Sequence, residues 1–220
     1  MTCAAIASLL ITFPGQARAN WQTSNDNGNV VAPTTTTAPK YVFPFSRVSV
    51  SYSHDHLNYP ATDVEGCYAK ILAPTSGTIV HTRRKDTWVE GIDEIGTRGG
   101  KTITLIGDDT VRYFFSHLGR VKVKIGQHVE AGDWIGVIGS SGNARITVCH
   151  VHLGMSRICP LAEISLLQGE LWPWRFLDAW QAGIQMSPRK AKNRLINLTP
   201  NGCAEATESF RGETQNRGGG

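Results

Sequence analysis

Four histidines and one aspartate in the middle of the chain have the types and spacing of a catalytic zinc site. His150 and His152 are two residues apart, and alternate side chains of a strand leave the same face, so both would point into one pocket. His56 and Asp63 lie upstream, and His117 follows an aromatic run. Two imidazoles and one carboxylate around zinc leave a coordination position open for water, which is the arrangement of a hydrolytic centre.

Such a centre could hydrolyse an amide bond. Zinc lowers the pKa of bound water to about 7 and polarises a carbonyl group. Free imidazole titrates at about 6.5, so His117 or His150 could take a proton from water and return it to the leaving amine. The sequence does not tell which of the two histidines is the base.

Three other histidines are considered as members of the site. His54 lies two residues before His56 and is an alternative first ligand. His81 and His128 fall outside the pattern, and we interpret them as surface or strand-packing residues. An isolated His-x-His motif in a strand usually belongs to a solvated face. The interpretation of His150 and His152 as part of a metal site therefore depends on His56, Asp63 and His117.

Several short sequence runs beside these residues resemble those of the lysostaphin-type zinc peptidoglycan endopeptidases. The runs are most similar to those of secreted actinobacterial members. The likeness extends over residues 42–182. The runs that carry it are Tyr-Pro-Ala-Thr-Asp at 59–63, Ser-His-Leu at 116–118, Gly-Asp-Asp at 107–109, Ser-Gly-Asn-Ala-Arg at 141–145, His-Val-His at 150–152 and Trp-Pro-Trp at 172–174. The resemblance implies one Zn²⁺ per chain held by His56, Asp63 and His152, with His117 and His150 as catalytic histidines that are not ligands.

Three further residues are candidates for substrate contact. Tyr113 lies four residues before His117, so it would share a strand face with it and could donate to a tetrahedral intermediate, although we favour core packing as its role. Loops 84–100 and 139–148 would flank a groove for an extended peptide. Arg98 and Arg145 in these loops could pair with a carboxylate of a peptidoglycan stem peptide.

The chain divides into four predicted segments. An apolar stretch at residues 3–13 followed by Ala17-Arg18-Ala19 predicts a signal peptide over 1–19. A polar, Thr/Pro-rich linker follows over 20–41, then a metallopeptidase domain over 42–182 and a C-terminal tail over 183–220. The protein is therefore expected to be secreted or associated with the cell wall, with no stable membrane insertion after cleavage.

Composition restricts the partners. The chain has 220 residues, a formal net charge of +4 and 40% hydrophobic residues, which suits one globular domain with tails. No basic stripe alternates with aromatic residues, so nucleic acid is not an expected partner. The basic cluster at 189–194 is interpreted as solvated. We expect a monomer that acts on peptidoglycan peptides.

Cysteine usage agrees with export. Loss of Cys3 with the signal peptide would leave four cysteines, and an even number in an oxidising compartment predicts two disulfides. We favour Cys149–Cys159 and Cys67–Cys203 among the three possible pairings. The spacings lack a C-x-x-C motif, which argues against a cysteine-based zinc site.

The remaining pattern predicts a mainly β fold, an antiparallel sheet or sandwich of the lysostaphin-type peptidase domain with one short C-terminal helix at 174–182. The predicted strands are 78–83, 101–106, 111–118, 121–124, 134–139 and 147–155.

These features predict an exported, zinc-dependent endopeptidase that hydrolyses peptide bonds in peptidoglycan. A catalytically silent scaffold of the same fold, which binds the wall or activates an amidase, is the alternative. The run at 125–136 also resembles biotinyl and lipoyl carrier domains, but no lysine lies at the hairpin tip.

Overall fold

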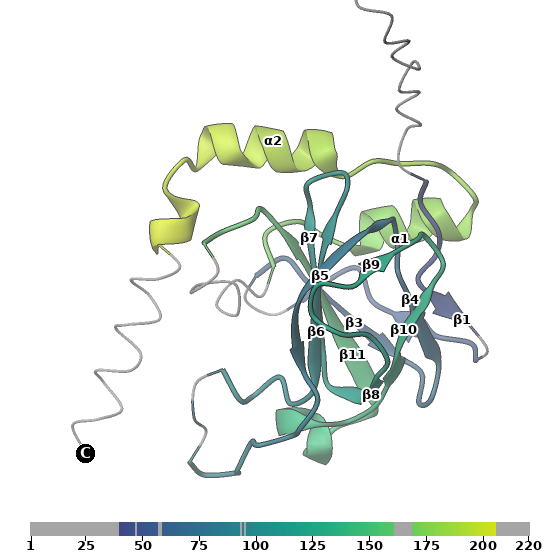
Figure 1. Ribbon diagram of the computed structural model, residues 1–220, viewed down its shortest axis with the longest axis vertical. Coiled ribbons are helices and arrows are strands. Elements are labelled where there is room, and N and C mark those ends of the chain that lie inside the picture. Colours follow the sequence, from purple (N-terminus) through teal and green to yellow (C-terminus); the bar gives the residue numbers. More distant parts are fainter. Residues whose placement is uncertain are drawn as a thin grey trace, which may run out of the picture. The chain divides into compact units, whose positions relative to one another are not determined.

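The chain forms two antiparallel β-sheets with helices at the C-terminal end (Figure 1). The structure is a computed structural model that describes residues 40–46, 48–56, 59–92, 94, 96–160 and 169–205. The predicted signal peptide, nearly all of the predicted linker and residues 206–220 lie outside the described residues. Among the described helices, none has the length and apolar character needed to cross a membrane.

The larger sheet has seven strands in the order β2-β3-β11-β7-β6-β5-β9. Its strands are β2 (Ser51–Tyr52), β3 (Thr62–Glu65), β5 (Gly77–Arg83), β6 (Thr102–Gly107), β7 (Arg112–Ser116), β9 (His128–Val129) and β11 (His150–Ser156). The smaller sheet has the order β1-β4-β10-β8, with β1 (Phe45–Ser46), β4 (Lys70–Leu72), β10 (Trp134–Ile138) and β8 (Leu118–Val121). The 3-10 helix η1 (Gly142–Ile146) and the helices α1 (Trp174–Gln181) and α2 (Arg189–Leu198) complete the fold.

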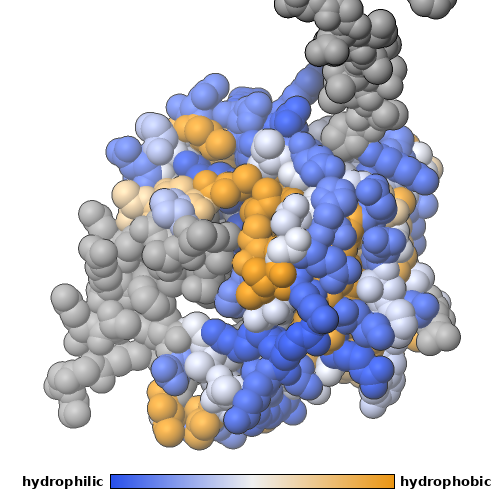
Figure 2. Space-filling view, viewed as in Figure 1, coloured by the Kyte–Doolittle hydropathy of each residue, from blue (hydrophilic) through white to orange (hydrophobic). Residues whose placement is uncertain are grey.

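Strand alternation separates the core from the site in the larger sheet. Val64 in β3 and Val151 and Leu153 in β11 belong to the hydrophobic core. Asp63 and His152 come from the alternate positions of the same strands, and they are directly opposite each other in the β3–β11 pair. The two-residue period of a strand therefore puts them on the other face of the sheet. The outer surface seen in Figure 2 is mostly hydrophilic.

The predicted mainly β fold is confirmed, but some of its details were wrong. The strand predicted at 111–118 is broken at His117, which has a positive φ of 63° and separates β7 from β8. Residues 122–124, predicted as a strand, are not assigned to one. The chain has a second helix, α2, inside the predicted tail. The helix was not predicted because this segment is mostly polar and was interpreted as a solvated basic cluster.

Helix α2 packs against the turn between β6 and β7. Lys192 is buried, and its Nζ donates to the Thr110 carbonyl oxygen and hydroxyl at 3.0 and 2.6 Å. Arg189 Nε donates to the Asp109 carbonyl oxygen at 3.0 Å. The basic cluster at 189–194, which we interpreted as solvated, therefore contributes two of its cations to packing. His117 lies at the opposite end of β7 from this turn.

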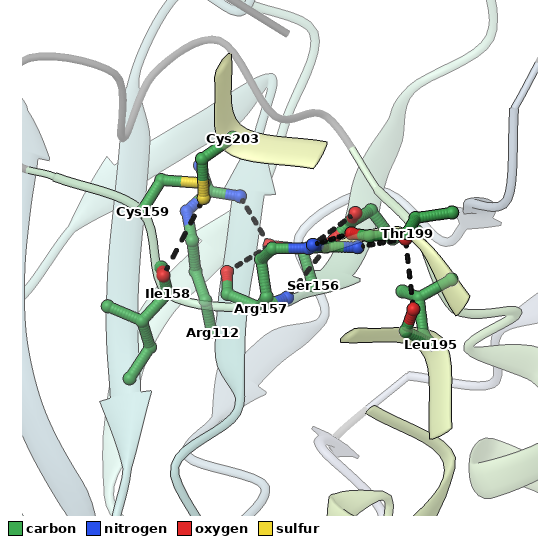
Figure 3. A network of polar contacts seen from close by, with 9 residues as sticks. Arg112, Ser156, Arg157, Ile158, Cys159, Leu195, Thr199 and Cys203 are labelled. Atoms are coloured by element: carbon green, nitrogen blue, oxygen red, sulfur yellow. Dashed lines mark hydrogen bonds and ion pairs between the residues drawn. A yellow bond between two sulfur atoms is a disulfide. The ribbon is translucent and has the colours of Figure 1, made fainter. Parts of the chain in front are cut away.

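The C-terminal end of β11 is joined to α2 by a buried arginine (Figure 3). Arg157 Nε donates to both Glu170 carboxylate oxygens at 2.8 and 3.0 Å. Its two terminal nitrogens donate to the carbonyl oxygen and hydroxyl of Thr199, which follows α2. A disulfide between Cys159 and Cys203 closes the same region. We call these five residues the C-terminal anchor.

The disulfide corrects the predicted pairings. Cys149–Cys159 and Cys67–Cys203 do not form, because Cys159 is bonded to Cys203. Residues 150–156 between Cys149 and Cys159 are an extended strand, which spans about 23 Å at 3.3 Å per residue. The two cysteines therefore lie near opposite ends of β11 and cannot be joined by a loop. Cys67 and Cys149 are free thiols.

Candidate functional site

Three possible metal ligands converge on the face of the larger sheet opposite the core. His56, Asp63 and His152 each present one ligand atom, and these atoms lie within 4.8 Å of one another. Asp63 Oδ1 is 2.9 Å from His152 Nδ1, and Asp63 Oδ2 is 3.8 Å from His56 Nε2. Ligand atoms around a tetrahedral zinc are separated by about 3.4 Å, so these distances suit zinc.

The hydrogen bond of His56 also fits a metal ligand. Its Nδ1 lies 3.1 Å from the Tyr59 carbonyl oxygen, which can only accept, so Nδ1 carries the proton in this bond. The lone pair is then on Nε2, the nitrogen that faces Asp63. A backbone carbonyl that fixes the tautomer of a ligating histidine is a usual outer partner of a metal site.

The protonation states of two of these residues favour metal binding. Burial and the neighbouring His152 lower the pKa of His56, which keeps its imidazole neutral. Burial alone would raise the pKa of Asp63, but the hydrogen bond with His152 and the nearby histidines outweigh it and lower the pKa. A neutral imidazole and an ionised carboxylate are the forms that bind a metal.

The structure separates the two candidates for the first ligand. His54 Nε2 lies 3.1 Å from Asp178 Oδ2, and its ring stacks on Trp174 with centroids 4.2 Å apart. Both contacts involve α1 or the residue at its start, away from Asp63. His56, with a ring 5.2 Å from that of His152, is the histidine that belongs to the cluster.

Two further histidines lie beside the cluster. The rings of His117 and His150 are 4.9 Å apart, and His117 is 6.5 Å from His152. His117 Nδ1 is 2.9 Å from the Ser141 carbonyl oxygen, and His150 Nδ1 is 2.7 Å from that of Val148. Each bond puts the proton on Nδ1 and leaves Nε2 able to accept one.

The positions of these histidines follow from the strand register. His152 is opposite Ser116 in the β11–β7 pair, so the residue after Ser116 lies next to it. His117 adopts its left-handed conformation there, and its backbone N–H donates to the Gly99 carbonyl oxygen at 2.8 Å. Non-glycine residues in this conformation are uncommon and often mark functional positions. Burial lowers the pKa of His117 to about 4, so its ring is neutral at neutral pH.

Tyr113 is not part of the site. Its side chain is fully buried in the core, and its hydroxyl donates to Asp109 at 2.7 Å. The expectation that it contacts substrate was wrong because the left-handed turn at His117 ends the strand alternation that linked the two residues. Core packing, the role favoured from the sequence, describes its contacts.

An open groove of about 740 Å³ lies between loop 84–100 and η1, as expected for loops 84–100 and 139–148. Its lining includes Trp88, Ile92, Arg98, Asn143 and Ile146. Figure 2 shows a separate apolar group at the lower left, where loop 84–100 lies in Figure 1.

The two candidate arginines differ in their neighbours. Arg98 lies in the groove and near Tyr59 beside the histidine cluster, whereas Arg145 is paired with Asp86. Arg98 lies close enough to Tyr59 to oppose the rise in the pKa of Tyr59, which burial and Asp63 bring to about 12. The Tyr59 ring is 5.7 Å from that of His152. Arg145 binds Asp86, with Nη2 at 2.7 Å from Asp86 Oδ2.

Sequence reasoning missed three residues that orient the histidines. Tyr59, Ser141 and Val148 act through their carbonyl oxygens, which every residue type has, so composition gives no signal for them. Tyr59 and Ser141 do belong to two of the runs that carried the resemblance.

Residues 60–160 match the model of peptidase family M23. Over these residues the chain is similar to peptidase family M23. The match, which is somewhat less than half of the chain, includes Asp63, His117, His150 and His152 but begins after His56. The predicted lysostaphin-type family is therefore confirmed, whereas the predicted likeness to actinobacterial members stays a prediction.

Solved structures of similar proteins include the catalytic domain of lysostaphin from Staphylococcus simulans, with 24% identity, a TM-score of 0.43 and coverage of 60% of this chain and 92% of that one. A second structure of this antimicrobial peptidase has 24% identity and a TM-score of 0.46, covering 64% of this chain and 56% of the other. A zinc-containing peptidase from Vibrio cholerae has 18% identity and a TM-score of 0.39, with 53% and 36% covered. The comparison with curated proteins found no match.

Proposed function

We propose that this M23 peptidase is an exported, zinc-dependent endopeptidase that hydrolyses peptide bonds in bacterial peptidoglycan. The observation that carries the proposal is the convergence of His56, Asp63 and His152 within 4.8 Å, beside two histidines that are not needed as ligands. A single zinc ion held by these three residues would activate water and polarise the scissile carbonyl group.

His117 and His150 would handle the protons. In each ring Nδ1 is held by a backbone carbonyl oxygen, so Nε2 is oriented and can accept a proton from the attacking water. The same nitrogen can then donate that proton to the leaving amine. The rings are 4.9 Å apart, so both lie near the same reacting atoms, and a ring that has accepted the proton of the water becomes a cation that can donate to the developing oxyanion.

The groove suits an extended peptide. It is open to solvent, and Arg98 offers a cation for a carboxylate of the substrate. Arg145 is already paired with Asp86, so we assign it a structural role, which is to join η1 to loop 84–100 at the groove. Support for a peptidoglycan substrate comes from the predicted signal peptide, which would deliver the enzyme to the wall, and from the runs that resemble wall peptidases.

Mass spectrometry of fragments released from purified peptidoglycan tests this function. The zinc-loaded protein should release peptides with new amino termini, and the His152→Ala variant should release none. His81→Ala is a matched control, since His81 lies in β5, away from the cluster, and should leave release unchanged. Bound zinc without release of fragments would contradict the proposed substrate. A protein that binds no zinc would contradict the peptidase and favour the scaffold.

A further inference from the structure

Two thiols meet at the end of β3 and β11 that carries the candidate site. Cys67 follows β3 and is exposed, and Cys149 immediately precedes β11 and is partly exposed. Cys67 lies close enough to Cys149 to raise the pKa of the Cys149 thiol. Neither residue has a role in the proposed hydrolysis.

The backbone brings these thiols together. Glu65 is opposite His150 in the β3–β11 pair, so the next residues outward are Gly66 and Cys149. The Gly66 N–H donates to the Cys149 carbonyl oxygen at 3.4 Å, which continues the pairing by one residue. Gly66 has a φ of 151°, and a Cβ there would lie 2.7 Å from Val50 Cγ1. The chain can therefore turn at this glycine and return Cys67 toward Cys149.

We infer that Cys67 and Cys149 form a second, reversible disulfide that closes the site end of the β3–β11 pair. The oxidant is a disulfide of low molecular weight or a thiol–disulfide oxidoreductase. Two S–H bonds break and one S–S bond forms, and the two electrons and two protons convert the oxidant disulfide into two thiols.

The order of the exchange follows from exposure. Burial, and then the neighbouring Cys67, raise the pKa of Cys149 to about 12, so Cys149 is a poor first nucleophile. Exposed Cys67 would attack the oxidant and form a mixed disulfide. The Cys149 sulfur, which the strand pairing places beside Cys67, would then attack the Cys67 sulfur and displace the leaving thiol. The Cys159–Cys203 bond lies beyond the other end of β11 and does not compete.

The bond would restrain residues that orient the catalytic histidine. The Val148 carbonyl oxygen holds His150 Nδ1 at 2.7 Å, and Cys149 lies between these two residues. Cys67 follows the strand that carries Asp63. A disulfide would therefore tie the support of His150 to the strand of a proposed ligand, and reduction would release it.

Peptide mapping of the full chain tests the bond without reference to peptidase activity. The protein is reduced, then incubated with glutathione disulfide, alkylated and digested without reductant. We expect a linked peptide containing Cys67 and Cys149 and a second containing Cys159 and Cys203. The Cys67→Ser variant should lose only the first, and the matched Cys203→Ser variant only the second.

Alkylation of both Cys67 and Cys149 when Cys159–Cys203 has formed would overturn the inference. A glutathione adduct that never resolves, or a linkage of either residue to Cys203, would overturn it as well. Hydrogen exchange gives a second readout: amides of residues 147–150 should exchange about tenfold more slowly in the oxidised protein than in Cys67→Ser. Equal exchange would show that the bond does not restrain the site.

Discussion

The two ends of β11 differ in how their polar side chains are satisfied. At its start, each of His56, His117 and His150 has one ring nitrogen fixed by a carbonyl oxygen and the other left for a ligand or a proton. At its end, the Arg157 guanidinium is buried and bound to Glu170 and Thr199. The start of β11 therefore has ring nitrogens available for a metal or a substrate, whereas the polar groups at its end are bound to one another.

This difference predicts that the two ends can be damaged separately. Changes at the start of β11 should remove metal binding or turnover and leave folding intact. Changes at the C-terminal anchor should lower the free energy of unfolding and leave the metal affinity of the folded protein intact.

The largest effect is expected from Asp63→Ala. Loss of the carboxylate between two histidines should remove zinc and lower kcat/KM by about 10³-fold or more. Turnover of a synthetic peptide and the metal content of the purified protein measure the effect. Glu65→Ala, two residues along the same strand and exposed, is the control and should retain both. Asp63→Ala with full zinc would contradict the assignment.

Arg157→Ala should be the most damaging change at the anchor. It leaves the Glu170 carboxylate without its cation in a poorly hydrated place, which costs about 3–5 kcal/mol in the free energy of unfolding. Urea denaturation checks this value. Arg175→Ala removes an exposed arginine of α1 and should cost less than about 1 kcal/mol. Similar costs for the two variants would show that the anchor does not stabilise the fold.

His117→Ala should lower kcat by about 10²-fold while zinc remains bound, because it removes a proton acceptor and no ligand. Steady-state kinetics and metal analysis of the same sample separate the two effects. His128→Ala is matched to it, since His128 is exposed and its ring lies 3.4 Å from Glu130, outside the histidine cluster. Near-normal turnover in His117→Ala would remove this residue from the mechanism.

Asp86→Asn should have the smallest effect, a rise in KM of roughly tenfold. Asp86 Oδ2 accepts from Gly142 N at 2.9 Å and from Arg145, so it joins loop 84–100 to η1 across the groove. The amide would keep the shape but lose the charge. The control is Glu94→Gln, an exposed residue in the same loop. An unchanged KM would mean that the groove does not bind the substrate.

The start of β11 was predictable because its signal is local. Strand alternation placed His150 and His152 on one side, and the resemblance supplied Asp63 and His117. The register that puts Asp63 opposite His152 is a long-range property, and so is the contact of His54 with Asp178 that separates His54 from His56. Two histidines two residues apart give no local signal that distinguishes them.

The anchor could not be predicted because its partners are distant in the sequence. Cys159 and Cys203 are 44 residues apart, and helix α2 lies between them in the chain. Arginine and lysine are rarely buried, so a sequence-based interpretation leaves Arg157 and Lys192 at the surface. Their burial depends on Glu170, Thr199 and Thr110, and the sequence does not indicate which elements bring these residues together.

Zinc stoichiometry in three proteins tests the central claim most directly. The wild type and His54→Ala should each bind about one zinc per chain, and His56→Ala should bind zinc far more weakly, because His56 faces Asp63 whereas His54 contacts Asp178. Metal analysis after dialysis against a weak chelator gives the values. Retention of zinc by His56→Ala together with its loss from His54→Ala would contradict the site described for β3 and β11.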